Sequence, residues 1–545
     1  MSKALLPSRR RLLGGSLLAI LWLAGCASTQ APPQFAQPDA LYRAVNRIGW
    51  GATQDQLDEA RRLGWGAYVE RQLKADPRRP LLPAAQGQID ALSIEQRPAL
   101  ELLQQVEQLR KDQDKPLSSC PQVGAARRPP PEGDKPAWGG PAPTCEDDRK
   151  AARQAYQNEL NRLAREAAHR QLLRQLYSEQ QLLEQVSWFW FNHFNVHQYK
   201  RELRALLADY EETALRPQAL GSFRELLGAV ARHPAMLRYL DNDQNTAGKP
   251  NENYARELLE LHTLGVDGGY TQRDVQELAR VLTGFGARLD PGRPRLRPEQ
   301  DRLYLRQGLF EFNPARHDFG DKQLLGHVIK GRGAAELDEV LDLLVAQPAT
   351  ARFVSRKLAV YLLSDEPPPA LVERMAAAFQ RSGGAIGATL RVLLLAPEFA
   401  DAAPRKFKDP QHYLLSGLRA AYGGMGEPAV IQNSAPLQAW LRRLGQGLYD
   451  KQTPDGYPLT AAAWNSAGQL STRFELARSL AAGPAALFKP EGLPAGAAAP
   501  PAPRPLLAQA LQPPLSPTTR AALAQAATPL DWNALLLSSP EFMYR

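Results

Sequence analysis

Hydrophobic residues recur at helical spacing along most of the chain. Near the start, Leu41, Val45 and Ile48 fall on one face of a helix that begins near Asp39 and ends in the glycine-containing segment 49–53. The same spacing predicts helices over residues 148–178, 181–197, 201–214, 222–240, 252–264 and 272–283, and further helices within 335–381 and 385–422. This pattern predicts a mainly α-helical fold, organised as a large multi-helix globular domain.

Three segments depart from the helical pattern. Residues 287–330 combine Tyr304, Phe310 and Phe312 with glycine, proline and aspartate, which predicts a small β-hairpin or extended element near 300–330. Residues 111–147 are a Pro-rich insertion and residues 483–517 an Ala/Pro-rich linker, and we expect both as surface loops. The remaining parts are an N-terminal helical part at 39–110, a central helical core at 148–286, a C-terminal helical part at 331–482 and a final helix within 518–545.

The first residues have the pattern of an export signal. Basic residues at 9–11 precede an apolar stretch over 12–23 that is too short to cross a bilayer comfortably. The stretch ends in Leu23-Ala24-Gly25-Cys26, the pattern of a lipoprotein cleavage site. We therefore expect residues 1–25 to be a signal peptide, Cys26 to carry lipid, and residues 26–38 to be a tether to the membrane. The alternative is an ordinary secretory signal with an incidental cysteine.

Two further features bear on localisation. The basic run at 8–11, followed by leucines, is similar to a twin-arginine export motif, and a plain basic segment is an open alternative. Alanine rather than aspartate follows Cys26. By analogy with lipoprotein sorting in Gram-negative bacteria, this favours the periplasmic face of the outer membrane.

Charge and cysteine content limit the possible partners. The formal net charge is +9, and the signal segment carries four of these charges. Acidic and basic residues are interspersed along the rest, so nucleic-acid binding is not expected. Of the 3 cysteines, Cys120 and Cys145 remain if Cys26 is lipidated. Both lie in the Pro-rich insertion of an exported chain, where oxidation is permitted, and we expect them to form a disulfide.

One stretch is distinctive enough to resemble a known family. Residues 251–265 read NENYARELLELHTLG and are followed by VDGGYT at 266–271 and ARVLTG at 279–284. Together they resemble the central motif of the bacterial "domain of unknown function 1800" family. Supporting matches, within about residues 39–545, are NRIGWGAT at 46–53, WFNHF at 190–194, HD at 317–318, FVSRKL at 353–358 and PDGY at 454–457.

The resemblance implies a setting but no reaction, because the activity of that family is not established. It implies an exported protein. Members are often encoded beside a second exported family, "domain of unknown function 1501", which resembles sulfatase-type hydrolases. The resemblance therefore implies a sulfatase-like protein of that family as a partner.

The central helix at 252–264 carries a polar face that could line a site. Glu252, Arg256 and Glu260 are spaced four residues apart with Glu257 beside them, whereas His262 falls on the apolar half. The same spacing is typical of a solvated ion-pair ladder next to a hydrogen-bonded core histidine.

Other histidines are candidates for acid–base chemistry or binding. His193 and His197 are four residues apart, as in a zinc protease, but phenylalanine at 194 replaces the general base, and a packed aromatic helix also accounts for the pair. His317-Asp318 follows Pro314 in a predicted loop, a setting that suits acid–base work. An exposed histidine and a turn-capping aspartate are the alternative.

The loop after the central helix has part of a calcium-binding pattern. Asp267 and Asp274 match positions of an EF-hand loop, but threonine at 263 and glycine at 265 replace its usual acidic ligands. The segment also fits a glycine-closed helix end followed by a new helix, with Thr271 as N-cap and Asp274 at the third helical position. We predict the second arrangement, and the sequence identifies no firm metal site and no cofactor.

Two functions are compatible with these features. The lipid anchor, the Pro-rich loops and the lack of a nucleophile motif favour a non-catalytic scaffold or assembly factor of the cell envelope. The alternative is an envelope hydrolase or other enzyme with a site built from His193, Arg256, Glu252, Glu257 and His317. For that site we predict that the polar face of 252–260 packs beside the loop 317–318 rather than against solvent.

Overall fold

The computed structural model describes residues 35, 38–114, 145–290, 292–401, 406–422, 429–490 and 514–545. They belong to one compact unit that starts at Pro33. The expected signal peptide, Cys26 with its expected lipid and most of the expected tether lie outside the described residues, as does Cys120 with its expected disulfide to Cys145. None of the helices in the described part has the length and apolar character needed to cross a membrane.

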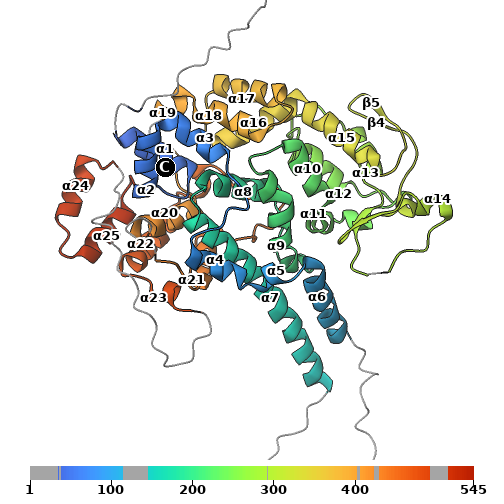
Figure 1. Ribbon diagram of the computed structural model, residues 1–545, viewed down its shortest axis with the longest axis horizontal. Coiled ribbons are helices and arrows are strands. Elements are labelled where there is room, and N and C mark those ends of the chain that lie inside the picture. The colour runs from blue at the N-terminus through green and yellow to red at the C-terminus, as the bar shows by residue number, and fades with distance from the viewer. Residues whose placement is uncertain are drawn as a thin grey trace, which may run out of the picture. The chain divides into compact units, whose positions relative to one another are not determined.

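The fold is mainly α-helical, as the hydrophobic spacing predicted (Figure 1). Thr53 occupies the N-cap of α2, and Gly64 ends that helix with a φ of 76°, a backbone conformation that favours glycine. The N-terminal part consists of α1 (Pro38–Ile48), α2 (Gln54–Leu63), α3 (Trp65–Leu73), α4 (Pro83–Asp90), α5 (Ser93–Gln96) and α6 (Ala99–Gln113).

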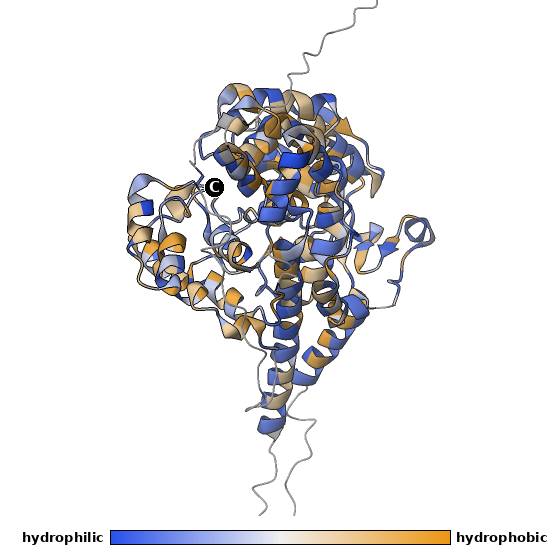
Figure 2. Ribbon diagram, turned by 60° about the vertical axis from the view of Figure 1, so that its left-hand side comes forward, coloured by the Kyte–Doolittle hydropathy of each residue, from blue (hydrophilic) through white to orange (hydrophobic). Residues whose placement is uncertain are grey.

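The long helix α7 (Cys145–Tyr177) follows the insertion and packs beside α6 (Figure 1). Because α6 and α7 include residues 111–113 and 145–147, the ends of the predicted insertion are helical rather than loop. Figure 2 shows hydrophilic residues along the part of α7 that borders the insertion. Residues 115–144 lie outside the described part.

Helix α8 (Gln181–His193) is buried on nearly all sides, and its aromatic side chains lie in the core. The ring of Trp190 lies 4.8 Å from that of Phe189, 5.9 Å from that of Phe194 and 5.6 Å from that of Phe223. The helix ends four residues before the predicted end, so His193 and His197 do not share a helical face. The zinc-protease spacing of this pair therefore has no structural counterpart.

Residues 201–218 form short turns instead of the helix predicted over 201–214. Arg201 has a left-handed backbone with a φ of 51°, which prevents a regular helix from starting there. The chain then passes through η2 (Leu203–Ala205), α9 (Leu207–Asp209), the π-helical turn η3 (Tyr210–Leu215) and η4 (Arg216–Gln218).

The helix predicted over 222–240 is divided in two by a proline. Pro234 lacks the N–H that a continuous helix requires, and it occupies the first turn of a new helix instead. The two helices are α10 (Phe223–Arg232) and α11 (Pro234–Tyr239), and η5 (Asn242–Gln244) follows them.

Two central helices lead into the small β elements. Helices α12 (Glu252–Glu260) and α13 (Gln272–Val281) precede β1 (Phe285–Ala287). Helix α14 (Pro298–Asp301) follows β1, and η6 (Pro314–Arg316) precedes β4. Strand β3 (Phe310–Phe312) pairs antiparallel with β1 and with β2 (Leu305–Gln307), and β4 (Lys322–Leu324) pairs with β5 (His327–Ile329). The β element predicted near 300–330 is thus confirmed, and β1 adds a strand from outside that range.

The C-terminal part is helical again. Helix α16 packs against α15 and α17, and α22 packs against α25 (Figure 1). The predicted linker contains the short helix α23, and its residues 491–513 lie outside the described part. The elements are α15 (Ala335–Ala346), α16 (Pro348–Leu362), α17 (Pro369–Arg381), α18 (Ile386–Leu394), α19 (Pro397–Asp401), α20 (Pro410–Tyr422), α21 (Ala435–Arg443), η7 (Ala461–Ala463), α22 (Ala467–Ala481), α23 (Ala485–Phe488), α24 (Pro517–Ala524) and α25 (Pro529–Ser538).

Candidate functional site

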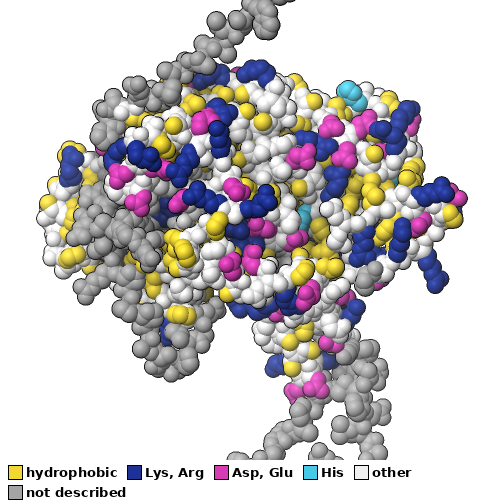
Figure 3. All heavy atoms as spheres, in the orientation of Figure 1, with side chains coloured by type: hydrophobic (Ala, Val, Ile, Leu, Met, Phe, Trp, Pro, Cys, Tyr) yellow, Lys and Arg dark blue, Asp and Glu magenta, His cyan; other side chains and the backbone are white. Residues whose placement is uncertain are grey.

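The polar face of α12 does not meet its predicted partner. Arg256 lies 3.1 Å from a carboxylate oxygen of Glu252 and donates to the side chain of Gln272 at 2.9 Å. The Arg256 side chain is 41% exposed. On the face drawn in Figure 3, basic and acidic side chains are interspersed. The prediction that this face packs beside His317-Asp318 is wrong, because Glu252 and Gln272 already satisfy the guanidinium at the surface.

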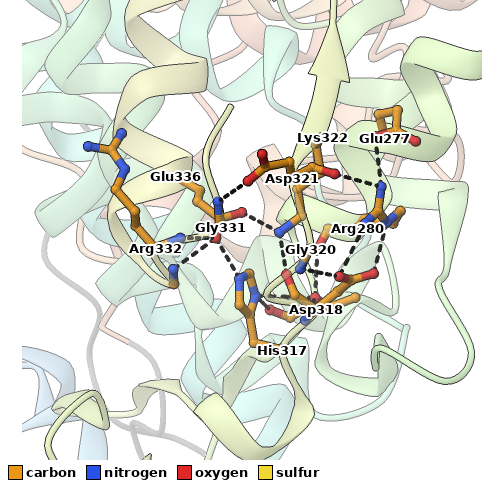
Figure 4. A network of polar contacts seen from close by, with 12 residues as sticks. Glu277, Arg280, His317, Asp318, Gly320, Asp321, Lys322, Gly331, Arg332 and Glu336 are labelled. Carbon is orange, nitrogen blue, oxygen red and sulfur yellow. Dashed lines mark hydrogen bonds and ion pairs between the residues drawn. The ribbon is translucent and has the colours of Figure 1, made fainter. Parts of the chain in front are cut away.

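His317 lies in a buried polar network instead of an open loop (Figure 4). Its Nδ1 atom is 2.8 Å from the carbonyl oxygen of Thr283, and its Nε2 atom is 2.9 Å from a carboxylate oxygen of Glu336. The ammonium group of Lys322 lies 2.6 Å from the other oxygen of Glu336. The side chains of His317, Lys322 and Glu336 are all 0% exposed, so no ligand reaches them in this arrangement.

Glu336, which the sequence did not single out, is the centre of that network. Its carboxylate also accepts the backbone N–H groups of Arg332 at 2.7 Å and Gly333 at 2.8 Å. Burial alone would raise the pKa of Glu336, but the hydrogen bonds from His317 and Lys322 lower it below its usual value. A buried carboxylate with this many donors is a structural anchor for the loop before α15.

Asp318 completes the network at its outer side. Arg280 of α13 donates to the two carboxylate oxygens of Asp318 at 2.8 and 3.2 Å, and Lys322 donates to the Asp318 backbone oxygen (Figure 4). Hydrogen bonding to Arg280 lowers the pKa of Asp318. The predicted acid–base pair 317–318 is therefore fully engaged in holding α13, β4 and α15 together.

The loop after α12 is a helix cap rather than a calcium site. The side chain of Thr271 accepts the N–H of Asp274, and a carboxylate oxygen of Asp274 accepts the N–H of Thr271, which forms a capping box at the start of α13. The other oxygen of Asp274 accepts the N–H of Leu325 at 2.6 Å, and Asp267 is exposed. Over the described ranges, no group of three or more His, Cys, Asp or Glu side chains could hold a metal ion.

His193 at the end of α8 contacts a lysine that the sequence did not single out. The Nε2 atom of His193 is 3.1 Å from the carbonyl oxygen of His262, so Nε2 carries the hydrogen and donates it. Nδ1 then accepts from the Nζ atom of Lys357 at 2.9 Å. Burial, together with the charge of Lys357, lowers the pKa of His193 well below its usual value, so the ring is neutral.

Lys357 is a partly exposed residue of α16, and protein atoms surround much of its amine. Burial lowers its pKa to about 8, although Asp455 opposes the shift. The position is unusual because Thr350, Val354 and Tyr361, at helical spacing from Lys357, are all buried. A lysine within an otherwise buried helical stripe is the signal from which sequence reasoning could have found this residue.

A second histidine, His262, borders this pair, and its ring nitrogens make no hydrogen bond to the described residues. His262 is 0% exposed. Its ring centre lies 6.1 Å from that of His193, and burial lowers its pKa to about 3. The buried hydroxyl of Tyr254, a ring neighbour at 6.3 Å, also has no partner in the described part. The sequence prediction that His262 is buried holds, but the predicted hydrogen bond of its ring is not found.

Two carboxylates lie on the outer side of the lysine. The Asp455 side chain is 56% exposed and interacts electrostatically with both Lys357 and Glu257. Burial and the charge of Glu260 raise the pKa of Glu257, which the sequence had nominated as a candidate. Lys451, 3.5 Å from Asp455, offsets part of the negative charge of these two carboxylates.

The loop 450–457 is fixed onto the end of α8. Asn192 donates to the backbone oxygen of Tyr457 at 2.9 Å and accepts its N–H at 2.6 Å. Asn195 donates to the backbone oxygen of Thr453 at 2.8 Å. Gly456 has a φ of 76°, and a Cβ atom there would collide with the backbone oxygen of Asn192. The position of Asp455 is therefore fixed by the hydrogen bonds of Thr453 before it and Tyr457 after it in the chain.

Four segments that are far apart in the sequence thus meet at one place. They are the segments 190–194, 251–265, 353–358 and 454–457, which carried the family resemblance, and they supply His193, Glu257, His262, Lys357 and Asp455. Of the predicted site residues, His193 and Glu257 belong to this cluster. Glu252, Arg256, His317 and Asp318 belong to other contacts. We refer to the five residues as the Lys357 cluster.

The π-helical turn η3 contributes a separate buried charge cluster. Glu211 accepts the hydroxyl of Tyr449 at 3.0 Å and lies 3.8 Å from Arg170. Burial raises the pKa of Glu211 to about 7, whereas the neighbouring Glu212, paired with Arg174 at 2.6 Å, has a lowered pKa despite its burial. The cluster links α7, η3 and the residue just before the loop 450–457.

The fold and the Lys357 cluster define a mainly helical protein in which a lysine–histidine pair lies near two carboxylates. Residues 43–544 match the model of the family described as "Protein of unknown function (DUF1800)". The chain belongs to this family. No curated protein and no solved structure matches it.

Proposed function

We propose that the chain is an exported, lipid-anchored protein of the bacterial cell envelope that acts as a scaffold or assembly factor. The observation that carries this proposal is the state of the predicted catalytic residues. His317, Asp318 and Arg256 are held in ion pairs and hydrogen bonds with their neighbours and do not converge on one cleft. The basic and apolar pattern that ends at Cys26 supports the anchor.

The anchor is tested by Cys26→Ala in the native host. We expect the wild-type protein to fractionate with outer membranes and the variant to move to the soluble fraction, because the lipid chains provide the attachment. Cys120→Ala is the matched control and is expected to stay with the membranes. Unchanged membrane association of Cys26→Ala would refute the anchor.

The scaffold role is tested through its expected partner, an exported sulfatase-like protein of the domain of unknown function 1501 family. We expect this protein to co-purify with the wild-type chain from detergent-solubilised envelopes. We also expect it to lose its membrane association when the Cys26→Ala variant replaces the wild type. Recovery of the chain free of any such protein would contradict the partnership.

A second candidate function, an enzyme of the cell envelope, is favoured by the Lys357 cluster. The four family segments meet there, and a lysine with a lowered pKa beside a neutral histidine is typical of catalytic sites. The test is to incubate envelope extracts with wild type and with Lys357→Arg and to compare the products by mass spectrometry. A product that forms only with the wild type supports an enzyme, and identical products exclude one that depends on Lys357.

A further inference from the structure

We propose that the amine of Lys357 forms a Schiff base with an aldehyde or ketone that is neutral or positively charged. The proposal rests on the second function given above, the enzyme, and specifies its chemistry. In this step the amine nitrogen adds to the carbonyl carbon, and a C=N bond replaces the C=O bond. The carbonyl oxygen leaves as water with both hydrogens of the neutral amine, so no oxidant or reductant is required.

The amine of Lys357 has a different kind of partner from the amines of three other half-buried or buried lysines. Lys200 lies 2.8 Å from Asp241, Lys322 2.6 Å from Glu336 and Lys406 2.7 Å from Asp365, and each of these carboxylates stabilises a charged ammonium. In the described part of the chain, Lys357 has no carboxylate within ion-pair distance, and its amine contacts the neutral ring of His193 instead. The amine of Lys357 is therefore not held in an ion pair, whereas Lys406, whose pKa burial also lowers to about 8, is held by Asp365.

The geometry of His193 keeps the neutral amine in a reactive orientation. Because Nε2 of His193 donates to the backbone of residue 262, Nδ1 presents a lone pair to Lys357. The amine satisfies that lone pair with one N–H bond. Its own lone pair remains available to attack a carbonyl carbon, which a salt bridge to a carboxylate would prevent.

The surroundings of Lys357 fit a carbonyl ligand of limited charge. His262 is neutral, so one of its nitrogens carries a hydrogen, and that hydrogen has no acceptor among the described residues. A carbonyl oxygen is an acceptor of the required kind. On the outer side, Asp455 and Glu257 disfavour an anionic ligand, and Lys451, 3.5 Å from Asp455, offsets only part of their charge.

The test is reductive alkylation of the wild-type protein at neutral pH, with sodium cyanoborohydride to trap the imine. Benzaldehyde is the neutral probe, and 4-carboxybenzaldehyde is its anionic counterpart. Peptide mass spectrometry compares Lys357 with Lys330, which is exposed, and with Lys408, which is buried. We expect benzaldehyde to label Lys357 about tenfold faster than Lys330, because a lower pKa leaves more free amine. Lys408 is expected to stay unlabelled because this residue is only 2% exposed, whereas Lys357 is partly exposed.

The anionic probe tests the effect of these two carboxylates, Asp455 and Glu257. We expect 4-carboxybenzaldehyde to lose most of the preference for Lys357, and Asp455→Asn to restore part of it. Labelling of Lys357 no faster than that of Lys330 with benzaldehyde would overturn the proposal. The failure of this proposal can be told apart from the failure of the enzyme function. If a reaction product depends on Lys357 but no imine is trapped, Lys357 acts as an acid–base group and the Schiff base is rejected. If an imine is trapped but no product depends on Lys357, the enzyme function is rejected and the reactivity of the amine stands.

Discussion

The hydroxyl of Tyr449 donates a hydrogen bond of 3.0 Å to Glu211 and so joins the residue before the loop 450–457 to the π-helical turn η3. Both side chains are buried, and Tyr449 has a left-handed backbone with a φ of 59°. Because burial raises the pKa of Glu211 to about 7, this carboxyl changes its charge near neutral pH inside the protein. Single π-helical turns often occur where a helix is adapted to a local function, and here the turn holds an ionisable pair.

Glu211→Gln is expected to flatten the pH dependence of stability between pH 4.5 and about 7. The folded chain holds this proton more tightly than the unfolded chain, so the wild type loses stability as the pH rises through that window. Glutamine keeps an oxygen for Tyr449 and does not ionise. The midpoint of thermal unfolding across this pH range measures the effect. Glu212→Gln is the control. Because the pKa of Glu212 is lowered in the folded chain, Glu212 stabilises the fold as the pH rises, and its replacement should remove that stabilisation.

Lys357→Met is expected to stabilise the protein while it removes the amine. The pKa of Lys357 is about 8 in the folded chain against 10.5 for an ordinary lysine, so the folded chain binds this proton less tightly than the unfolded chain. Stability is therefore reduced below pH 8 and recovers as the pH rises from about 8 to 10.5. We expect the free energy of unfolding to rise by about 1–3 kcal/mol at neutral pH, and this increase to become smaller in alkaline solution. Lys330→Met, at an exposed position, is the control, and a less stable Lys357→Met variant would contradict the expectation.

Glu336→Gln is expected to destabilise the protein by about 3–5 kcal/mol, because it leaves the buried ammonium of Lys322 without a carboxylate. Glu339→Gln on the same helix is the control, since Glu339 pairs with Arg332 at the surface. The double variant Lys322→Met, Glu336→Met is expected to recover part of the loss. Chemical denaturation measures all three, and a neutral Glu336→Gln would mean that the network does not stabilise the fold.

Arg256→Ala is expected to lower the free energy of unfolding by no more than about 0.3–0.5 kcal/mol, which is the usual contribution of an exposed helical ion pair. Its effect should add to that of His317→Ala without coupling, because the two residues share no partner. Arg280→Ala is expected to cost more, since Arg280 contacts both Asp318 and Glu277. A measurable coupling between Arg256 and His317 would restore the site predicted from the sequence.

Gly456→Ala is expected to displace the loop 450–457 and with it Asp455. The positive φ of Gly456 disfavours alanine, and the added Cβ collides with the backbone of Asn192. We expect Lys357 to remain reactive but to lose its discrimination against 4-carboxybenzaldehyde. Gly468→Ala is the control, because nothing lies within 4 Å of a Cβ there. Unchanged discrimination would show that Asp455 does not control access.

Local signals in the sequence predicted the helices where the determining residues are neighbours. Thr271 and Asp274 are three residues apart and form the predicted capping box. The interruption at Arg201 and the π-helical turn were missed, because contacts with distant helices impose them. A helical periodicity contains no information about such contacts.

The site was predicted only in part for a related reason. His193 and Glu257 were nominated from their residue types, but Lys357 and Asp455 acquire their properties from each other and from burial. The pairing of His317 with Glu336 likewise crosses between two elements, and a sequence in which His317 follows a proline gives no sign of it. Residue spacing within a helix predicted an ion pair for Arg256, and that pair is present.

The bonds between Asn192 and Tyr457 join residues that are 265 positions apart. A growing chain can complete α8, α12 and α16 and still lack the loop that closes around the lysine, so the site matures late in synthesis. The compartment in which it matures depends on the export route. A twin-arginine substrate would carry a finished site across the membrane, whereas a chain exported unfolded would acquire it only outside. Aldehyde labelling of Lys357 in the uncleaved precursor would therefore report which route the protein takes.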